Sequence, residues 1–305
     1  MASAADRLAP PAVLLRAFYV AASILILVIR AVPALNTRFL AYGSRAASPA
    51  SPAASQHRSH HDRRRREPRQ SPLDQLLDYA ASFQVPHNFF THFYELSVAC
   101  SAFWGWRLRL WNAHSPLQLV WLLMLLQGAR RFLESHTYTS TSKSNMWFGH
   151  WLLGLVFYLT VNVAVWVEGV GNVDSKKGQG QAHGSHPFWK TVLLVPAILT
   201  SHALQHTYHA YLYRLRTEHS GYQLPSHPLF PNLVCPHYTC EVAIYALLSL
   251  LAAPEGAHIN WTMASATLFV AVNLGVTAAG TKQWYMDKFG PDKVSNRRRM
   301  IPWVW

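Results

Sequence analysis

Long apolar segments separated by short polar connections make up most of the chain between residues 14 and 279. Such segments are typical of helices that cross a membrane, although several are shorter than the ~20 residues that a perpendicular helix needs. The pattern therefore predicts an all-α, polytopic membrane protein of about seven transmembrane helices. The predicted spans are Leu14–Ala34, a segment from Ser82 to Trp111, Pro116–Leu126, Met146–Val167, Phe188–Leu212, His237–Ala252 and Trp261–Ala279.

Composition and charge agree with a membrane protein. The chain is 50% hydrophobic and only 13% charged, whereas about a quarter of the residues in soluble proteins are charged. The formal net charge is +13, but the basic residues lie in the connections between apolar segments, which speaks against a nucleic-acid-binding surface. The cysteines, Cys100, Cys235 and Cys240, form no CxxC pair, so neither a disulfide nor a structural zinc is expected.

The amino-terminal part divides into two regions. Residues 1–40 are predicted to hold the first transmembrane helix, with a signal peptide as the alternative because the core Phe18–Ile29 is short. Residues 41–81 are rich in Ala, Ser and Pro and then strongly basic, with Arg63–Arg66 in a row. We expect a disordered cytosolic loop there, and contact of its basic part with anionic lipid is the alternative.

The basic residues also predict an orientation. With residues 36–88 in the cytosol, most lysines and arginines fall on the cytosolic side, including those of the carboxyl terminus. The sequon Asn260-Trp-Thr262 then faces the opposite side. Because it adjoins a span, its glycosylation stays open.

A polar stripe interrupts the end of the fifth predicted span. His202, Gln205, His206 and His209 have the spacing i, i+3, i+4 and i+7, so they share one face of a helix. Polar side chains at membrane depth are costly unless they face a bundle interior or a cavity. Our interpretation is that the stripe faces a buried anionic cofactor.

Further polar residues collect at the cytosolic ends of the other spans. Glu95, Glu134 and Glu241 are carboxylates close to hydrocarbon, which need partners, and arginines suited to bidentate phosphate contacts are available. We therefore expect one pocket that opens to the cytosol, although each residue alone has an ordinary structural explanation. The remaining members are His92, Tyr94, Arg130, Arg131, His150, Gln205, His209, Arg216, His237, Tyr238, Tyr285 and Arg297.

The histidines raise a metal alternative. His202, His206 and His209 resemble part of a histidine box, as in membrane di-iron hydroxylases. Those enzymes need several boxes with paired histidines, and the only His-His here is His60-His61 in the basic loop. No metal site is therefore predicted. A Rossmann fingerprint is also absent, because the glycines from Gly178 to Gly184 have the wrong spacing.

Several short blocks of residues between about Val85 and Trp305 occur in a characteristic order. Through these blocks the chain resembles the steroid 5-alpha-reductase family, specifically its polyprenol reductase branch. Each block is weakly specific alone, but their order and spacing are quite specific. The blocks are Val85-Pro86 with Phe90-x-His92-Phe93-Tyr94; Arg130-Arg131-x-x-Glu134; His202 to Arg216; Pro236-His237-Tyr238-x-x-Glu241; and Trp284-Tyr285-x-x-Lys288-Phe289 with Arg297 and Ile301-Pro302.

The resemblance implies a seven-helix membrane fold that uses NADPH, with residues 82–305 as its C-terminal membrane domain. It implies saturation of a carbon–carbon double bond next to an oxygen function. For this branch the substrate is a long-chain polyprenoid lipid whose alpha-isoprene unit is reduced, which supplies dolichol for protein N-glycosylation. The compartment would be the endoplasmic reticulum membrane, with the carboxyl terminus cytosolic.

The resemblance also assigns residues. His92 and Tyr94 would lie near the substrate head as candidate acids. Lys282 replaces the family's histidine, His237 replaces its Asn, and the catalytic tyrosine of the steroid branch aligns near Gly128, which argues against a steroid substrate. The residues expected to line the cofactor are Arg131, Gln205, His209, Arg216, His237, Glu241, Tyr285 and Arg297.

The chemistry favours an aldehyde as the immediate acceptor. An isolated alkene does not accept hydride, whereas an alkene conjugated to a carbonyl does, because charge developing on the oxygen can be stabilised. We therefore predict that polyprenal rather than polyprenol is reduced, with an acid group on the aldehyde oxygen. The alternatives are another steroid or enoyl reductase, a di-iron lipid hydroxylase and a non-enzymatic lipid-binding protein of seven helices.

Overall fold

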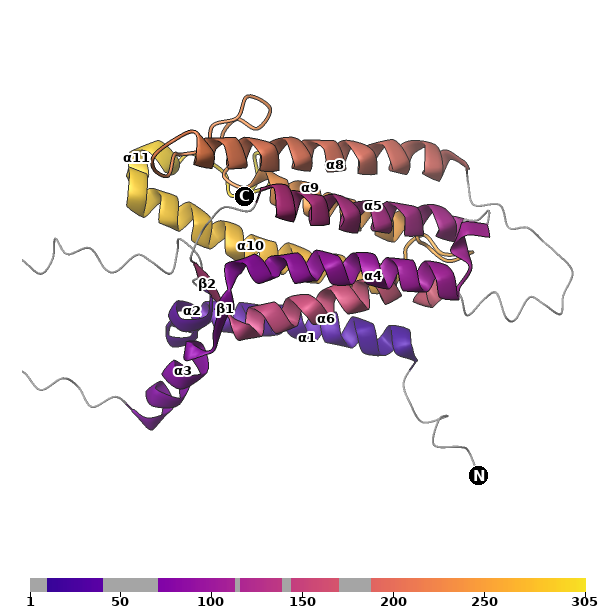
Figure 1. Cartoon of the computed structure of the whole chain (residues 1–305), viewed down its shortest axis with the longest axis horizontal. Coiled ribbons are helices and arrows are strands. Elements are labelled where there is room, and N and C mark those ends of the chain that lie inside the picture. Colours follow the sequence, from indigo (N-terminus) through magenta and orange to yellow (C-terminus); the bar gives the residue numbers. More distant parts are fainter. Residues whose placement is uncertain (1–9, 41–70, 113–115, 139–143, 170–187) are drawn as a thin grey trace, which may run out of the picture.

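The computed structural model describes residues 10–40, 71–112, 116–138, 144–169 and 188–305. Long helices lie side by side and account for most of these residues (Figure 1). The elements are α1 (Pro11–Ala31), α2 (Pro33–Phe39), α3 (Pro72–Ser82), β1 (Gln84–Pro86), η4 (His87–Phe90), α4 (Thr91–Arg107), η5 (Leu110–Asn112), α5 (Pro116–Thr137), β2 (Asn145–Trp147), α6 (Phe148–Ala164), α8 (Phe188–Thr217), α9 (Pro236–Leu251), α10 (Trp261–Phe289) and α11 (Pro291–Val294).

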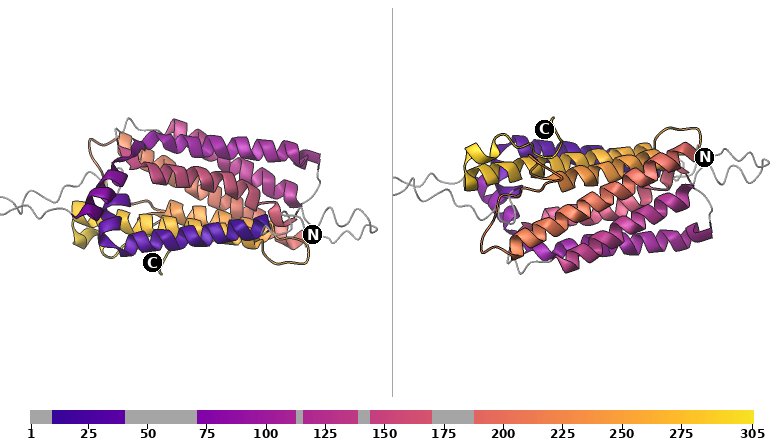
Figure 2. Two further views of the ribbon diagram at one scale, coloured as in Figure 1. Left: turned by 90° about the horizontal axis from the view of Figure 1, so that it is seen from below. Right: turned by 90° about the horizontal axis from the view of Figure 1, so that it is seen from above.

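The helices pack in two connected groups. Helix α4 lies between α5 and α6, while α9 lies between α8 and α10, and α1 packs along α10. Both perpendicular views show the same bundle with its helices roughly aligned (Figure 2). The groups meet where α6 contacts α10 and where α5 contacts α8 and α9.

Local sequence accounts for several helix ends. Pro11 and Pro236 stand at the first turns of α1 and α9, where the missing N–H has no cost. Helix α1 ends at Ala31 because Pro33 begins α2. Gly290 has a φ of 90°, which ends α10, and Pro291 then begins α11.

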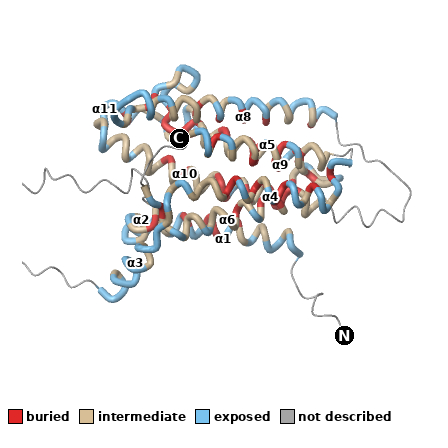
Figure 3. The backbone as a smooth tube through the Cα atoms, viewed as in Figure 1, coloured by how far each residue is buried: buried red, intermediate tan, exposed pale blue. Residues whose placement is uncertain are grey.

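The core is apolar and aromatic. Tyr19 of α1, Phe157 of α6 and Phe269 of α10 meet there, and the Phe157 and Phe269 rings stack 5.3 Å apart. Buried residues follow the inward sides of the helices, while the outward sides are exposed (Figure 3). Many outward residues are large and apolar, such as Leu25 and Leu193 at 57% and 61% exposure, which suits a lipid environment.

Each predicted span coincides with a long helix, namely α1, α4, α5, α6, α8, α9 and α10 in order. Among the described residues, 3 helical segments are long and apolar enough to cross a membrane by themselves: Pro11–Ala31, Phe148–Gly169 and Trp261–Phe289. The chain is therefore a mainly helical protein with membrane-spanning character. The total of about seven crossings stays a prediction.

Some helices extend well beyond the predicted spans. Helix α5 continues through Arg130 and Glu134 to Thr137, and α10 continues ten residues beyond Ala279 to Phe289. The apolar pattern ends earlier because these last turns carry polar residues. Those of α5 face the protein interior, as described below, whereas Gln283 and Asp287 of α10 are exposed. Helix α8 tolerates Pro196 in its interior.

The loop predicted to be disordered over residues 41–81 is helical at its carboxyl-terminal end. Residues 41–70 lie outside the described residues, but Pro72–Ser82 form α3, contrary to the prediction for positions 72–81. The Ser71 side chain accepts a hydrogen bond from the Asp74 N–H and caps this helix. Arg38 of α2 forms ion pairs with Asp74 and Asp78 and so holds α3 against α2.

The two-stranded sheet was also not predicted from the sequence. Strand β1 pairs antiparallel with β2, with Val85 opposite Met146. Three residues on each side are too few for a recognisable alternation. The ladder places the start of α4 beside the start of α6, next to the site described below.

A polar cluster joins α1, α6 and α10 at the other end of the bundle. Arg16 Nη2 lies 2.6 Å from Glu168 Oε1, and Glu168 accepts hydrogen bonds from the Trp261 and Thr262 N–H groups at the start of α10. Asn260 is fully buried, and its Nδ2 donates to the Ala164 carbonyl oxygen. The sequon asparagine is therefore part of the helix packing.

Candidate functional site

Glu134 on α5 is the centre of a buried polar network at the opposite end. It is one helical turn from Arg130 and Arg131, and both guanidiniums approach it: Arg130 Nη1 lies 2.5 Å from Oε1 and Arg131 Nη1 lies 2.5 Å from Oε2. Only 4% of the Glu134 side chain is exposed. Such a carboxylate needs both cations, because removal of a charge from water is costly unless it is paired and hydrogen-bonded.

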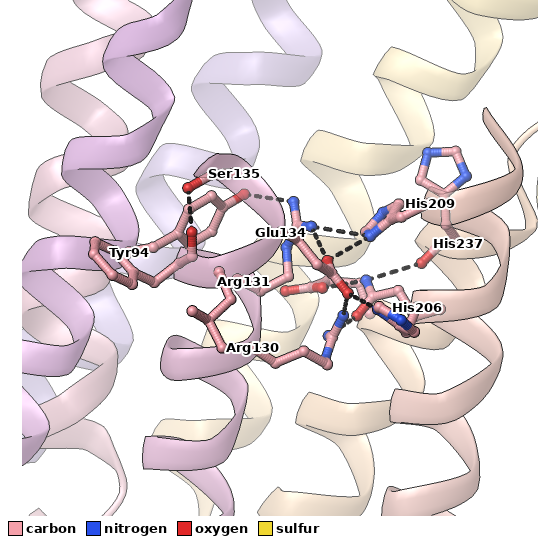
Figure 4. Close-up of polar contacts among 12 residues, drawn as sticks. Tyr94, Arg130, Arg131, Glu134, Ser135, His206, His209 and His237 are labelled. Carbon is pink, nitrogen blue, oxygen red and sulfur yellow. Dashed lines mark hydrogen bonds and ion pairs between the residues drawn. The ribbon is translucent and has the colours of Figure 1, made fainter. Parts of the chain in front are cut away.

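The polar stripe on α8 contacts this cluster (Figure 4). Its members share one face of α8, as their spacing predicts. His206 Nδ1 lies 2.8 Å from Glu134 Oε1, and His209 Nδ1 lies 2.8 Å from Glu134 Oε2 and 2.9 Å from Arg131 Nη1. The remaining two members turn toward Arg130, which donates to His202 Nδ1 and to Gln205 Oε1.

Two glutamines connect Arg130 with the carboxylate of Glu241 on α9. The oxygen atoms of Gln127 and Gln205 each accept a hydrogen bond from Arg130 Nη2. Their Nε2 atoms each donate to Glu241, Gln127 to Oε1 at 2.9 Å and Gln205 to Oε2. The amide orientations follow from these partners, and the Glu241 charge is stabilised without a direct arginine contact.

Tyr94 of α4 completes the network. Arg131 Nη2 donates to the Tyr94 hydroxyl oxygen at 2.6 Å, and the guanidinium carbon lies 4.7 Å from the centre of the Tyr94 ring. Because the hydroxyl oxygen accepts from Arg131, its own proton is free to be donated to another group. Residues of α4, α5, α8 and α9 thus meet at one depth.

The network forms part of the wall of a cavity of about 1080 Å³. Its α10 wall extends from Phe269 to Tyr285 and beyond, which is about 24 Å at the rise of an α-helix. Glu95 and Arg130, which were expected at the pocket, do not line the cavity, and of the residues assigned to substrate or cofactor His92 and Arg297 do not line it either. Those that do are Tyr94, Arg131, Gln205, His209, Arg216, His237, Glu241 and Tyr285.

The cavity differs in character along its length. Near the carboxyl ends of α8 and α10 it is basic and aromatic, with the Arg216 guanidinium 4.4 Å from the centre of the Tyr222 ring and Trp284 packed edge-on against Tyr222. Deeper in the bundle its lining includes Phe157 and Phe269, which belong to the core. A charged group is favoured at the first end and an apolar one at the second.

The two assigned residues that do not line the cavity have other surroundings. The His92 ring lies against Phe89 and Trp151, with ring centres 4.5 Å and 6.1 Å away. Arg297 donates from Nη1 to the Pro225 carbonyl oxygen and so holds the loop after α8. His92 was predicted from a block whose other members Phe90, Phe93 and Tyr94 do line the cavity.

The site contains residues that sequence reasoning did not assign to it. Gln127 was not considered, although a glutamine in an otherwise apolar helix is a usable signal. Asn273 of α10 also lines the cavity, and within the described residues its side chain has no hydrogen-bond partner. It stands in the apolar segment Leu268–Val276, where an unpaired amide signals a ligand-facing position.

The donor set suits a large anionic ligand with aromatic rings. Arg216 has no carboxylate partner among the described residues, so its charge is available at the basic end. His237 supplies a more specific indication, because its buried Nδ1 has no hydrogen-bond partner although the residue lines the cavity. A buried polar atom in this state is satisfied when a ligand supplies the missing group. Phosphate, ribose and ring systems are therefore suitable occupants.

The histidines do not form a metal centre in the part of the chain that the structure describes. There, no three His, Cys, Asp or Glu side chains lie close enough to hold a metal ion. His202 Nδ1 accepts a hydrogen bond from Arg130, and His206 and His209 contact Glu134. The arrangement is one of ion pairing rather than of metal ligation.

Comparison with known proteins gives consistent matches. The sequence profile of the 3-oxo-5-alpha-steroid 4-dehydrogenase family matches residues 151–305. A polyprenal reductase of Saccharomyces cerevisiae is 24% identical over 229 residues, which are 74% of this chain and 77% of the yeast protein. Polyprenal reductase 1 of Arabidopsis thaliana is 26% identical over 270 residues, covering 73% of this chain and 82% of that protein.

A steroid-directed relative matches a shorter segment. Steroid 5-alpha-reductase DET2 of Solanum lycopersicum is 28% identical over 93 residues, which are 30% of this chain and 33% of the tomato protein. The matches with the two polyprenal reductases thus extend over more of both chains.

Proposed function

Because the chain belongs to the 3-oxo-5-alpha-steroid 4-dehydrogenase family, we propose that this oxidoreductase uses NADPH to saturate the alpha-isoprene double bond of a long-chain polyprenoid. The immediate acceptor is the polyprenal. The product enters dolichol synthesis for protein N-glycosylation, and the protein lies in the endoplasmic reticulum membrane with a cytosolic carboxyl terminus.

One observation carries this proposal. A single cavity of about 1080 Å³ contains a basic, aromatic end, a buried polar network and an apolar, aromatic interior. A phosphorylated dinucleotide needs the first, a carbonyl the second and an isoprenoid chain the third. The polyprenal reductases of yeast and Arabidopsis, which match across most of this chain, support the same substrate class.

The cofactor is assigned to the basic end and the network. Arg216 and Tyr285 would hold its phosphates and an aromatic ring, and the unpartnered Nδ1 of His237 would receive one polar group. Arg131, Gln205, His209 and Glu241 would fix the remaining wall, while Arg297 would act indirectly through the loop that it holds. When bound, the reduced nicotinamide supplies the hydride.

Tyr94 is our candidate for the acid. Its hydroxyl borders the cavity and accepts from Arg131, so its proton is available to a carbonyl oxygen of the substrate. As negative charge develops on that oxygen, a positioned O–H donor beside a guanidinium stabilises it in a water-poor site. His92 is the less suitable candidate, because it does not line the cavity.

Glu134 and His209 position this acid. Glu134 Oε2 holds Arg131 on the side opposite Tyr94, and His209 contacts both charged groups. The guanidinium therefore has one orientation, which keeps Tyr94 in place. The apolar walls around Phe157 and Phe269 exclude water from the reacting end.

A steroid substrate is the second candidate. The tomato steroid 5-alpha-reductase favours it, with 28% identity over 93 residues. A 3-oxo steroid with a conjugated double bond presents the same enone chemistry to the same acid. It would differ from polyprenal in lacking a long chain that continues into lipid.

The deciding experiment uses the full-length chain purified in detergent or nanodiscs. Polyprenal, polyprenol and a conjugated 3-oxo steroid are each incubated with NADPH, and with NADH for comparison, and products are identified by mass spectrometry. With NADPH, we expect polyprenal to gain two hydrogen atoms, as saturation of one double bond requires. Turnover of polyprenol without any turnover of polyprenal would overturn the proposed acceptor, and steroid turnover alone would support the second candidate.

A further inference from the structure

A second hollow, of about 690 Å³, lies on another side of α10. We call it the α1–α10 hollow; its walls are α1 around Leu27 and Arg30, one face of α9, the outer face of α10 and the segment from Arg299 to Trp305. The lining is mostly aliphatic. Because α1 and α10 are two of the helices able to cross a membrane, this hollow faces the lipid.

Small side chains on α10 create the space. Ala271, Gly275 and Ala279 are four residues apart, so they lie on one face of the helix. A Cβ atom on Gly275 would lie 3.4 Å from the Trp305 ring, an ordinary van der Waals contact. Trp305 therefore covers Gly275 in the middle of this face, while Ala271 and Ala279 line the hollow on either side.

Two arginines border the same hollow. The Arg299 guanidinium lies 4.8 Å from the centre of the Trp305 ring, and its Nε atom is buried without a hydrogen-bond partner. Arg30 is exposed at the last turn of α1. Neither guanidinium has a carboxylate partner within the ranges that the structure describes. Two positive charges thus stand at one border of an aliphatic space.

We infer that the α1–α10 hollow binds one anionic glycerophospholipid, with an acyl chain along Ala271, Gly275 and Ala279 and its phosphate between Arg30 and Arg299. The charge decides this occupant. An apolar helix of a second copy would leave both guanidiniums unpaired, and a zwitterionic lipid would bring a cation next to them. Arg30 and Val276 line both this hollow and the large cavity, so the test below measures lipid retention rather than turnover.

The test is native mass spectrometry of the full-length protein in detergent. Equal amounts of dioleoyl phosphatidylglycerol and dioleoyl phosphatidylcholine are added, since these lipids share acyl chains and differ in charge. We expect one retained phosphatidylglycerol on the wild-type protein. Loss of an arginine near the membrane surface should reduce the preference about fivefold, and loss of both about 30-fold. The variants are Arg299→Gln and Arg30→Gln with Arg299→Gln.

Matched controls separate this site from surface charge and from misfolding. Arg214→Gln removes an exposed arginine from the end of α8, outside the hollow, and should leave the lipid preference unchanged. Gly275→Leu fills the hollow and should abolish retention, whereas Gly275→Ala fits beside Trp305 and should preserve it. Thermal melting of each variant verifies folding.

Three results would overturn the inference. The first is equal retention of the two lipids by the wild-type protein, which indicates ordinary boundary lipid. The second is an unchanged preference in folded Arg299→Gln and in the double variant. The third is displacement of the lipid by inorganic phosphate at millimolar concentration, which indicates an anion site that does not use the acyl chain.

Discussion

The replacement Tyr94→Phe tests the proposed acid most directly. It removes one oxygen atom, which accepts the 2.6 Å hydrogen bond from Arg131 Nη2, and leaves the ring that contacts Tyr158 and the guanidinium. The fold should therefore persist. Loss of a positioned acid lowers a rate about 100- to 10,000-fold, which corresponds to about 2.7 to 5.5 kcal/mol in the activation free energy.

The assay measures kcat/KM for polyprenal and, separately, the Kd for NADPH by fluorescence or calorimetry. We expect the fall in kcat/KM with an NADPH Kd within about threefold of wild type, because Tyr94 is assigned to the substrate. Tyr79→Phe on α3, outside the cavity, is the matched control. His92→Gln should retain activity close to that of the wild-type protein, since the His92 side chain does not line the cavity.

Two results would refute the reasoning. If Tyr94→Phe keeps more than about half of the wild-type kcat/KM, the hydroxyl is not the acid. If the Kd for NADPH rises as much as kcat/KM falls, Tyr94 holds the cofactor and another group protonates the substrate. A large loss in His92→Gln with a normal melting temperature would return the assignment to His92.

Three more predictions concern the network, the cavity and the opposite end of the bundle. Glu134→Gln leaves two partly buried guanidiniums without their buried carboxylate, so the free energy of unfolding should fall by about 3 kcal/mol; an unchanged melting temperature would contradict the pairing. Asn273→Leu should lower kcat/KM for polyprenal at least tenfold, while a leucine at neighbouring Val272, outside the large cavity, should have little effect. Asn260 should carry no glycan, because it is fully buried and hydrogen-bonded; a mobility shift after glycosidase treatment would show otherwise.

The positions of the helices were largely predictable, and their polar ends were not. Apolar length identified a helix at each predicted span, since burial in lipid or in the core requires the same composition. The pattern stopped short at Leu126 and Ala279 because α5 and α10 continue with polar and charged residues, which an apolar pattern does not count as part of a span. The predicted resemblance to the reductase family is confirmed by the match over residues 151–305.

Most residues of the candidate site were predicted from the sequence, but the contacts between them were not. The helical spacing of His202 to His209 correctly placed them on one face, and Gln205 and His209 line the cavity. Their partners Arg130, Arg131 and Glu134 on α5 were not predicted. Spacing along one helix does not reveal which helix lies opposite. Gln127 and Asn273 were missed although an amide in an apolar segment is itself a usable signal.

The glutamines that join Arg130 to Glu241 have a consequence for ligand entry. They fasten α5, α8 and α9 together at one level, so that wall of the cavity is rigid. Across the cavity, the Asn260 side chain at the start of α10 donates to the Ala164 carbonyl oxygen of α6 at the far end of the bundle. We expect a lipid substrate to enter between the halves of α6 and α10 that are remote from Asn260. A cleavable cross-link between these parts of α6 and α10 should stop turnover until it is cleaved. A cross-link between α5 and α8 should leave the activity unchanged.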